Sequence, residues 1–208
     1  MSRIAAVILA GGRGERLGGV IKANLTIGGR RLLERVSDAL GDADAILVSC
    51  GGFDPQTLAL LPSQIAIPDL PTGYGGPLAG LAATVDWATK QPNPPEILVL
   101  AAVDTPFLPP GYLPRLAESA TLAAIASFDS QPYPTSSAWR LDAVADLADQ
   151  VRAGTAPHSL KRLGEVLGAA EIPFPPHVGG DPFANLNTPE DRLALEARAA
   201  SFEQPARR

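Results

Sequence analysis

Short apolar runs alternate with amphipathic stretches along most of this chain. The first run, Ile4–Leu9, is apolar at every position, as expected for a central strand that is covered on both faces. Strands that alternate with helices are typical of a mostly parallel sheet with helices on both sides. The pattern therefore predicts an α/β fold.

The same pattern gives the expected positions of the elements. Strands are predicted at 4–9, 45–49, 64–67, 97–101, 122–126, 136–139 and 170–174. Helices are predicted at 31–40, 55–61, 78–89, 112–119, 141–153, 159–167 and 189–201. The alternation is continuous, so residues 1–208 are expected to form a single domain, with 202–208 as a frayed tail.

Composition narrows the class of protein. With 46% hydrophobic residues and a mean hydropathy of +0.10, the chain can build a core. A net charge of −5 without a basic cluster argues against a nucleic-acid partner. The single cysteine, Cys50, excludes an intrachain disulfide framework, and the sequence contains neither a signal peptide nor an apolar run long enough to span a membrane. We expect a cytoplasmic protein.

A glycine-rich loop directly follows the first strand, over residues 9–22. Several of its backbone N–H groups have no Cβ beside them, so the loop can surround an anion. Arg13, Arg16 and Lys22 add positive charge. The alternative is a structural strand-to-helix connection, but a simple turn rarely needs so many glycines and cations. The loop predicts that a nucleotide polyphosphate binds here.

Two common phosphate loops do not fit these residues. The dinucleotide pattern G-x-G-x-x-G fails because Leu17 stands where its last glycine belongs. The P-loop pattern G-x-x-x-x-G-K-[ST] fails because Val20 and Ile21 follow Gly19. A simple dehydrogenase is thereby disfavoured.

Two aspartates follow later strands. Asp104 comes after the strand predicted at 97–101, where a carboxylate beside a phosphate loop is an expected ligand for Mg²⁺. It could instead cap the turn before Pro106. Asp69 follows the strand predicted at 64–67 and could bond a sugar or base, or anchor its loop. Ligands of open α/β sheets bind at the carboxyl ends of the strands, where both aspartates are expected.

Two further segments carry polar groups. The glycine-rich stretch 73–80 opens a helix, so its N–H groups can face another ligand. Asn185 and Asn187 are two apart on an extended segment and therefore share a face. They could orient a polar acceptor or bind the metal through a carbonyl oxygen. They could also form Asx-type turn bonds ahead of the last helix.

Four segments, in this order and spacing, resemble the molybdenum cofactor guanylyltransferases (MobA type) of the nucleotidyltransferase superfamily. They are residues 9–22, 76–80, 104–109 and 185–191. The resemblance implies a three-layer αβα, Rossmann-like nucleotidyltransferase fold. It also implies an Mg²⁺-dependent enzyme that transfers GMP from GTP to the terminal phosphate of molybdopterin or the molybdenum cofactor and releases pyrophosphate.

The resemblance assigns roles by position. The nucleotide-binding residues would be Leu9, Ala10, Gly11, Gly12, Lys22, Ser49, Asp69 and Asp104. Arg16, Lys22 and Asp104 would be catalytic, with Asp104 also holding the metal, and Gly76, Pro77, Asn185 and Asn187 would bind the acceptor. The implied partners are GTP and a molybdopterin-type cofactor, with molybdoenzymes or other cofactor-assembly proteins as further candidates.

The chain departs from the family pattern at two positions. Ile21 precedes the loop lysine where the family often has aspartate, and Ser49 stands where an asparagine helps to read the base. Serine lacks the paired donor and acceptor of an amide. Two alternatives therefore stay open: a related nucleotidyltransferase that uses CTP or another phosphorylated acceptor, and a degenerate nucleotide-binding regulatory domain.

Overall fold

The computed structural model describes residues 2–203. Within them, seven strands form one sheet in the order β11-β9-β10-β8-β1-β6-β7. β10 is antiparallel to both of its neighbours, and the other neighbouring pairs are parallel. The strands are β1 (Ile4–Leu9), β6 (Ala45–Gly51), β7 (Gln64–Pro68), β8 (Ile97–Ala102), β9 (Ala123–Phe128), β10 (Gln131–Arg140) and β11 (Ala170–Pro173). This arrangement confirms the predicted, mostly parallel sheet.

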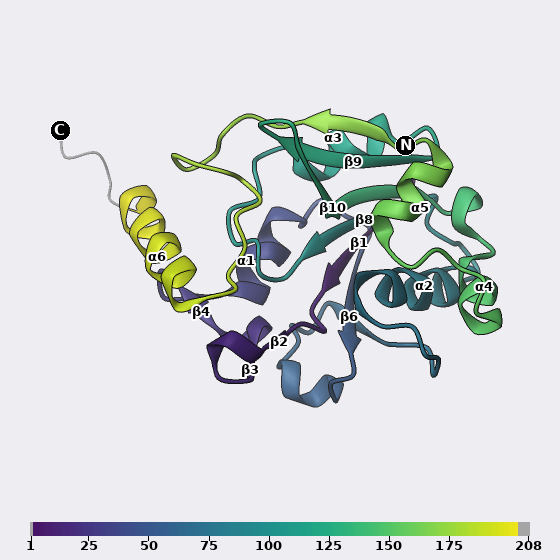
Figure 1. Cartoon of the computed structure of the whole chain (residues 1–208), viewed down its shortest axis with the longest axis horizontal. Coiled ribbons are helices and arrows are strands. Elements are labelled where there is room, and N and C mark those ends of the chain that lie inside the picture. Colours follow the sequence, from purple (N-terminus) through teal and green to yellow (C-terminus); the bar gives the residue numbers. More distant parts are fainter. Residues whose placement is uncertain (1, 204–208) are drawn as a thin grey trace.

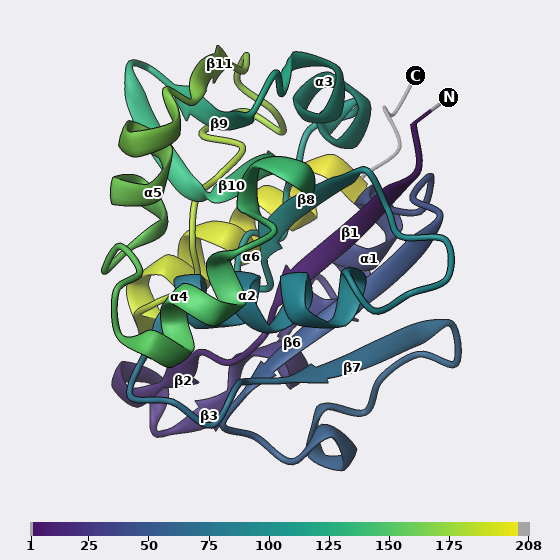
Figure 2. The same ribbon diagram turned by 90° about the vertical axis from the view of Figure 1, so that its right-hand side faces the viewer.

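Helices cover both faces, so the molecule has three layers (Figure 1, Figure 2). One face carries α2 (Gly76–Ala88), α4 (Leu147–Ala153) and α5 (Leu160–Leu167), and the other carries α1 (Leu32–Ala39), α3 (Tyr112–Ser119) and α6 (Pro189–Glu203). The predicted three-layer αβα fold is confirmed. None of the helices within residues 2–203 is both long and apolar enough to cross a lipid bilayer.

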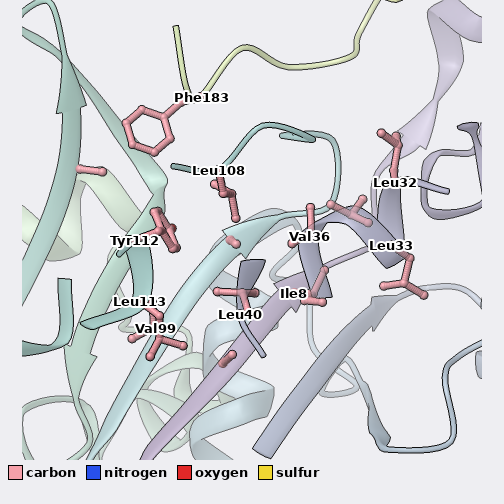
Figure 3. Packing of buried hydrophobic residues seen from close by; sticks show 14 of the residues in the cluster. Ile8, Leu32, Leu33, Val36, Leu40, Val99, Leu108, Tyr112, Leu113 and Phe183 are labelled. Carbon is pink, nitrogen blue, oxygen red and sulfur yellow. The ribbon is translucent and has the colours of Figure 1, made fainter. Parts of the chain in front are cut away.

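Each face of the sheet has its own apolar cluster. Successive residues of β1 alternate between them: Ala6 and Ile8 belong to the cluster under α1, α3 and α6, and Ala5 and Val7 to the cluster under α2, α4 and α5. Figure 3 shows side chains from α1, α3, β1 and β8 in the first cluster, with Val36 beside Ile8. Because β1 is buried on both sides, the loop that follows it starts from a fixed point.

The strand order places a topological switch beside β1. From β1 the chain continues to β6 and β7 on one side, and then crosses to β8 on the other side. In open α/β sheets, ligands bind at such a point, outside the carboxyl ends of the strands. The glycine loop and Asp104 follow the two strands that flank this point, β1 and β8.

One predicted strand is much shorter than the observed one. The strand predicted at 136–139 begins earlier, at Gln131, because a two-residue turn at Asp129 and Ser130, both with positive φ, joins it to β9. Pro132 and Pro134 obscured this extension. The first part of β10, which contains both prolines, pairs only with β9, because pairing with β8 starts at Ser137. Proline is tolerated there since that part of the strand has a neighbour on one side only.

Two helix predictions and part of the predicted tail also need correction. The segment 55–61 forms only a short 3₁₀ turn, η3 (Pro55–Leu58), which ends where Ala59 adopts a left-handed conformation. The segment 141–153 is divided into η4 (Asp142–Val144) and α4. The frayed tail predicted at 202–208 is wrong for 202 and 203, since α6 continues to Glu203 and the Phe202 ring packs against His177 at 6.1 Å. Residues 204–208 lie outside the described part of the chain.

Candidate active site

A cavity of about 390 Å³ lies at the carboxyl ends of β1, β6, β7 and β8. Ten residues singled out in the sequence line it: Leu9, Gly11, Gly12, Lys22, Ser49, Asp69, Gly76, Pro77, Asp104 and Asn185. The rest of the lining comes from Gly51, Gly52, Gly75, Ala102, Val103 and Thr135. Residues expected to bind the nucleotide, the metal and part of the acceptor therefore face one common space.

Close backbone packing shapes the part of the cavity at the ends of β1 and β6. A Cβ placed on Gly11 would lie 2.7 Å from the Cα of Gly51, and one on Gly51 would lie 2.6 Å from the Cα of Gly11. The two loops can approach this closely only because both residues are glycine. Ala10 is buried, and its N–H donates to the Ser49 carbonyl oxygen at 2.9 Å. This N–H continues the sheet ladder instead of facing the cavity.

The glycine loop turns back on itself as a small hairpin. Its arms are β2 (Arg13–Gly14) and β3 (Val20–Ile21), separated by the 3₁₀ turn η1 (Glu15–Leu17). Gly18 and Gly19 have φ of +83° and +75°, a conformation that favours glycine. The reversal brings the next turn, η2 (Lys22–Asn24), back beside the start of the loop. For this reason Lys22 lies near Gly12, ten positions earlier in the chain.

Lys22, in the glycine loop, contacts one residue from each of two other predicted motifs. Its Nζ lies 2.6 Å from Oδ2 of Asp104 and 2.6 Å from Oδ1 of Asn187. The side chains of Lys22 and Asp104 are only 9% and 15% exposed, so this pair is shielded from water and from salt. The N-terminal cationic loop and the carboxylate after β8 thus meet directly in the cavity.

The segment that carries the two asparagines is attached to Asp104 by its backbone. The N–H of Leu186 donates to the Asp104 carbonyl oxygen at 3.0 Å, and the Leu186 side chain is fully buried. Asn185 lines the main cavity on one side of this anchor. Asn187, on the other side, reaches Lys22. The two asparagines therefore line two neighbouring cavities, Asn185 the main one and Asn187 the adjoining one.

Two oxygen atoms at the cavity are buried without a hydrogen-bond partner among the described residues: Oδ1 of Asp69 and Oδ1 of Asn185. Burial raises the pKa of the Asp69 carboxyl above its ordinary value. Unpaired buried oxygens are costly, and in native proteins such atoms nearly always have a partner, which can be water, an ion or a ligand. Both atoms are suited to accept hydrogen bonds from, or to coordinate, a bound molecule.

Arg16 lies outside the main cavity. It is exposed on η1 and lines an adjoining hollow of about 330 Å³ together with Gly14, Glu15, Lys22 and Asn187. Lys22 lines both spaces. Arg16 is therefore placed to meet the part of a ligand that extends past Lys22.

Sequence reasoning did not select Thr135, Gly51 or Gly52 as site residues. Thr135 lies within a register shift of β10, between Tyr133 and Ser137, and such irregularities are common beside active sites. The adjacent Gly51 and Gly52 after the second strand were the available signal for the other two. No comparable signal distinguishes Thr135 from the hydroxyls next to it in the sequence.

The protein residues offer oxygen ligands for a metal but no complete metal site. Within residues 2–203, no group of three or more His, Cys, Asp or Glu side chains is arranged to hold an ion. The Asp104 carboxylate and the unpartnered amide oxygen of Asn185 both line the cavity. Mg²⁺ typically binds one or two carboxylates together with substrate phosphates. This donor set fits a metal that arrives with a polyphosphate.

Comparison with known proteins places the chain among nucleotidyltransferases. Residues 6–169 match the profile described as a MobA-like NTP transferase domain. The chain is 40% identical over 198 residues to the molybdenum cofactor guanylyltransferase of Rhodobacter capsulatus, covering 94% of this chain and 96% of that protein. It is 36% identical over 197 residues to that of Cereibacter sphaeroides strain ATCC 17029, with the same coverages.

A solved structure supports the fold independently. The molybdopterin-guanine dinucleotide biosynthesis protein A of Archaeoglobus fulgidus superposes with a TM-score of 0.68. The match covers 94% of this chain and 98% of that protein at 23% sequence identity. At this identity the likeness concerns the arrangement of strands and helices.

Proposed function

The chain belongs to the family of MobA-like NTP transferases, and we propose that it transfers GMP from GTP to the terminal phosphate of molybdopterin or the molybdenum cofactor, with release of pyrophosphate. Guanylyltransferases that match nearly the whole chain support this assignment. Residues 1–208 would act as one nucleotidyltransferase domain, consistent with the single large sheet and its two continuous apolar clusters.

One geometric observation carries the proposal: Lys22 of the glycine loop and Asp104 after β8 are in contact at 2.6 Å inside a common cavity. A cation and a carboxylate that lie this close can both reach one triphosphate and its metal ion. On opposite sides of the sheet they could not share that ligand. Their contact supports a role in the same step.

The transfer needs no nucleophile from the protein. A terminal phosphate oxygen of the acceptor attacks the α-phosphorus of GTP, a P–O bond forms on that side, and the bond to the leaving pyrophosphate breaks on the other. Positioning and neutralisation of charge supply the catalysis in reactions of this type. Lys22 would face the α-phosphate, and Arg16 would meet the leaving pyrophosphate from the adjoining hollow.

The remaining polar groups would orient the two substrates. Leu9, Gly11 and Gly12, which line the cavity, would present their backbone to the nucleotide, and Ser49 and Asp69 would contact the nucleoside. Gly76, Pro77 and Asn185 line the same cavity and would bind the acceptor, together with Asn187 in the adjoining hollow. The unpartnered oxygens of Asp69 and Asn185 would gain hydrogen-bond donors or a metal when both substrates bind.

We also propose that the enzyme requires Mg²⁺. Asp104 would hold the ion with phosphate oxygens, and the amide oxygen of Asn185 is available as a further ligand. Bound there, Mg²⁺ would neutralise negative charge on the phosphates. Lys22 would have to share or release Oδ2 of Asp104 as the ion binds, since that oxygen already accepts a hydrogen bond from its ammonium group.

The direct test is product formation. The protein is incubated with molybdopterin and Mg²⁺ and either GTP, CTP or ATP, and pyrophosphate and the dinucleotide are measured by a coupled assay and by mass spectrometry. We expect pyrophosphate and a guanine dinucleotide with GTP. Turnover only with CTP would establish a different nucleotidyltransferase, and tight GTP binding without any pyrophosphate would favour a regulatory domain. Chelation of divalent metal with EDTA should stop turnover, and added Mg²⁺ should restore it.

A further inference from the structure

The last helix, α6, begins at Pro189, two residues after Asn187, whose side chain contacts Lys22. Thr188 precedes its first residue, and Asp191 is three positions after Thr188. The N–H of Asp191 donates to Oγ1 of Thr188 at 3.1 Å. In return, Oδ2 of Asp191 accepts from the N–H of Thr188 at 2.8 Å and from the N–H of Asn187 at 2.9 Å. The two bonds between Thr188 and Asp191 form a capping box, and the bond from the N–H of Asn187 is additional to it.

The additional bond connects the cap to the active site. Asn187 is exposed as a residue, yet its Oδ1 lies 2.6 Å from Nζ of Lys22. An exposed asparagine side chain loses this position easily unless its backbone is fixed. On the side before Asn187, the backbone is held by the bond from Leu186 to Asp104. On the side after it, the backbone is held by Asp191.

We propose that Asp191 is a positioning residue for nucleotidyl transfer: its carboxylate fixes the backbone of Asn187 and Thr188 and thereby holds the Asn187 amide oxygen against Lys22. The inference rests on the proposed function, since it concerns the lysine of that site. Asp191 itself acts through Asn187 and does not contact the substrates. Burial alone would raise the pKa of the Asp191 carboxyl, but the hydrogen bonds from the N–H groups of Asn187 and Thr188 and, least of all, the Lys22 ammonium hold it below its usual value.

The rest of α6 is attached independently of this cap. Oε2 of Glu196 accepts from the N–H of Gly28 at 2.9 Å, beside β4 (Thr26–Ile27), where Figure 1 also shows α6. The Arg198 guanidinium donates to the carbonyl oxygens of His177, Val178 and Asp181. Loss of Asp191 should therefore release residues 187 and 188 while α6 stays in place. A positioning role is thus separable from a role in holding the helix.

The test uses the full-length protein and its transfer reaction. Asp191→Ala should lower kcat by roughly tenfold or more, the size expected when an outer residue no longer orients a catalytic group, with a smaller change in KM for GTP. Asp191→Glu should restore most of the activity, because glutamate is the usual partner in this cap. Glu190→Ala is the matched control: it removes the neighbouring acid from the same helical turn and should leave kcat within about twofold.

A double-mutant cycle decides whether Asp191 acts through Asn187. In the Asn187→Ala background, Asp191→Ala should change kcat by less than about twofold, since residues in one network are not additive. Full additivity of the two losses, or equal losses from Asp191→Ala and Glu190→Ala, would overturn the proposal. If the unmodified protein shows no GTP-dependent transfer, the proposed function fails instead, and that result is distinguishable because it precedes any substitution.

Discussion

The cavity has two walls that are built differently. One wall, here called the glycine wall, consists of Leu9, Gly11, Ser49, Gly51 and Asp69 at the ends of β1, β6 and β7. The other, the charged wall, consists of Lys22 and Asp104, with Asn187 behind the lysine. The glycine wall is shaped by close backbone contact and contains an unpartnered carboxylate oxygen. The charged wall is made of side chains that already satisfy one another.

The difference indicates how each wall would respond to a ligand. Backbone packed at van der Waals contact cannot move without cost, so the glycine wall is preformed and selects by shape. The charged wall can exchange partners, because Lys22 and Asp104 can each turn toward phosphate or metal. A triphosphate would therefore meet a rigid surface at its nucleoside end and an adaptable one at its phosphates.

The largest loss of activity is expected when one side chain of the charged wall is removed. Lys22→Ala or Asp104→Ala should reduce kcat by roughly 10²-fold or more, comparable to the loss of one group that stabilises the transition state. Steady-state kinetics measures the effect. Lys90→Ala is the control, since it removes a lysine that is ion-paired with Asp86 at the surface and should leave turnover unchanged. Near-normal turnover in either cavity variant would refute the role of the charged wall.

A single added methyl group in the glycine wall should disrupt its packing and lower the stability of the protein. In Gly11→Ala or Gly51→Ala, the new Cβ would meet backbone at 2.7 or 2.6 Å, so the two loops must separate. Overpacking of this kind typically costs about 1–3 kcal/mol, or a fall in Tm of roughly 2–4 °C for each kcal/mol in a protein of this size. GTP binding should weaken as well. Gly52→Ala is the control, because its Cβ would enter open space in the same cavity. Equal thermal stability of all three variants would contradict the packing argument.

The pH dependence of GTP binding tests the glycine wall, because a comparison with Asp69→Asn isolates the part that comes from Asp69. Burial raises the pKa of this carboxyl, so it takes up a proton at a higher pH than an ordinary aspartate. If its ionised form accepts a hydrogen bond from the nucleoside, GTP affinity should fall as the pH drops through that raised pKa. Asp69→Asn should bind more weakly at neutral pH and lack this component, which calorimetry from pH 7 downward would detect.

The same raised pKa has the opposite consequence for the unliganded protein. An acid whose pKa is higher in the folded state destabilises that state as the pH rises from the unfolded pKa to the folded one. Asp69→Asn should therefore unfold at the same or a higher temperature than the unmodified protein at pH 7. A pH profile of GTP binding identical in the two proteins would mean that Asp69 does not contact the nucleotide.

The smallest effect is expected at Arg16, which lies beyond the charged wall in the adjoining hollow. Because this side chain is exposed, its contact with a phosphate should contribute about 0.2–1 kcal/mol, equivalent to at most about fivefold in kcat/KM. Raising the salt concentration should reduce the difference between Arg16→Ala and the unmodified protein. A loss of kcat/KM as large as that of Lys22→Ala would contradict this prediction and would mean that Arg16 acts together with Lys22 and Asp104.

Much of the glycine wall could be predicted from the sequence, because its residues follow apolar strands directly. A parallel sheet brings the carboxyl ends of such strands to one edge, so the positions of Gly11 and Asp69 followed from the alternation of elements. The contact between Gly11 and Gly51 could not be predicted, since it depends on how closely two loops approach. Thr135 was missed because nothing in the sequence distinguishes it from the neighbouring hydroxyls, and because Pro132 and Pro134 hid the extension of β10.

The charged wall was predictable in composition but not in geometry. The glycine loop identified Lys22, and the segment before the last helix identified Asn187. That the two side chains meet depends on the hairpin of the loop and on the anchoring of Leu186, neither of which leaves a periodic pattern. The same holds for Asp191, whose spacing from Thr188 suggests a helix cap but not its bond to Asn187.

A crystal structure with a GTP analogue that cannot be cleaved, guanosine 5′-[α,β-methylene]triphosphate, tests the central claim most directly. We predict that guanosine lies against the glycine wall, with Asp69 and Ser49 in contact, and that Lys22 leaves or shares Asp104 to reach the phosphates. Binding of the triphosphate away from Lys22 and Asp104, with their 2.6 Å contact intact, would contradict the assignment of both walls to one ligand.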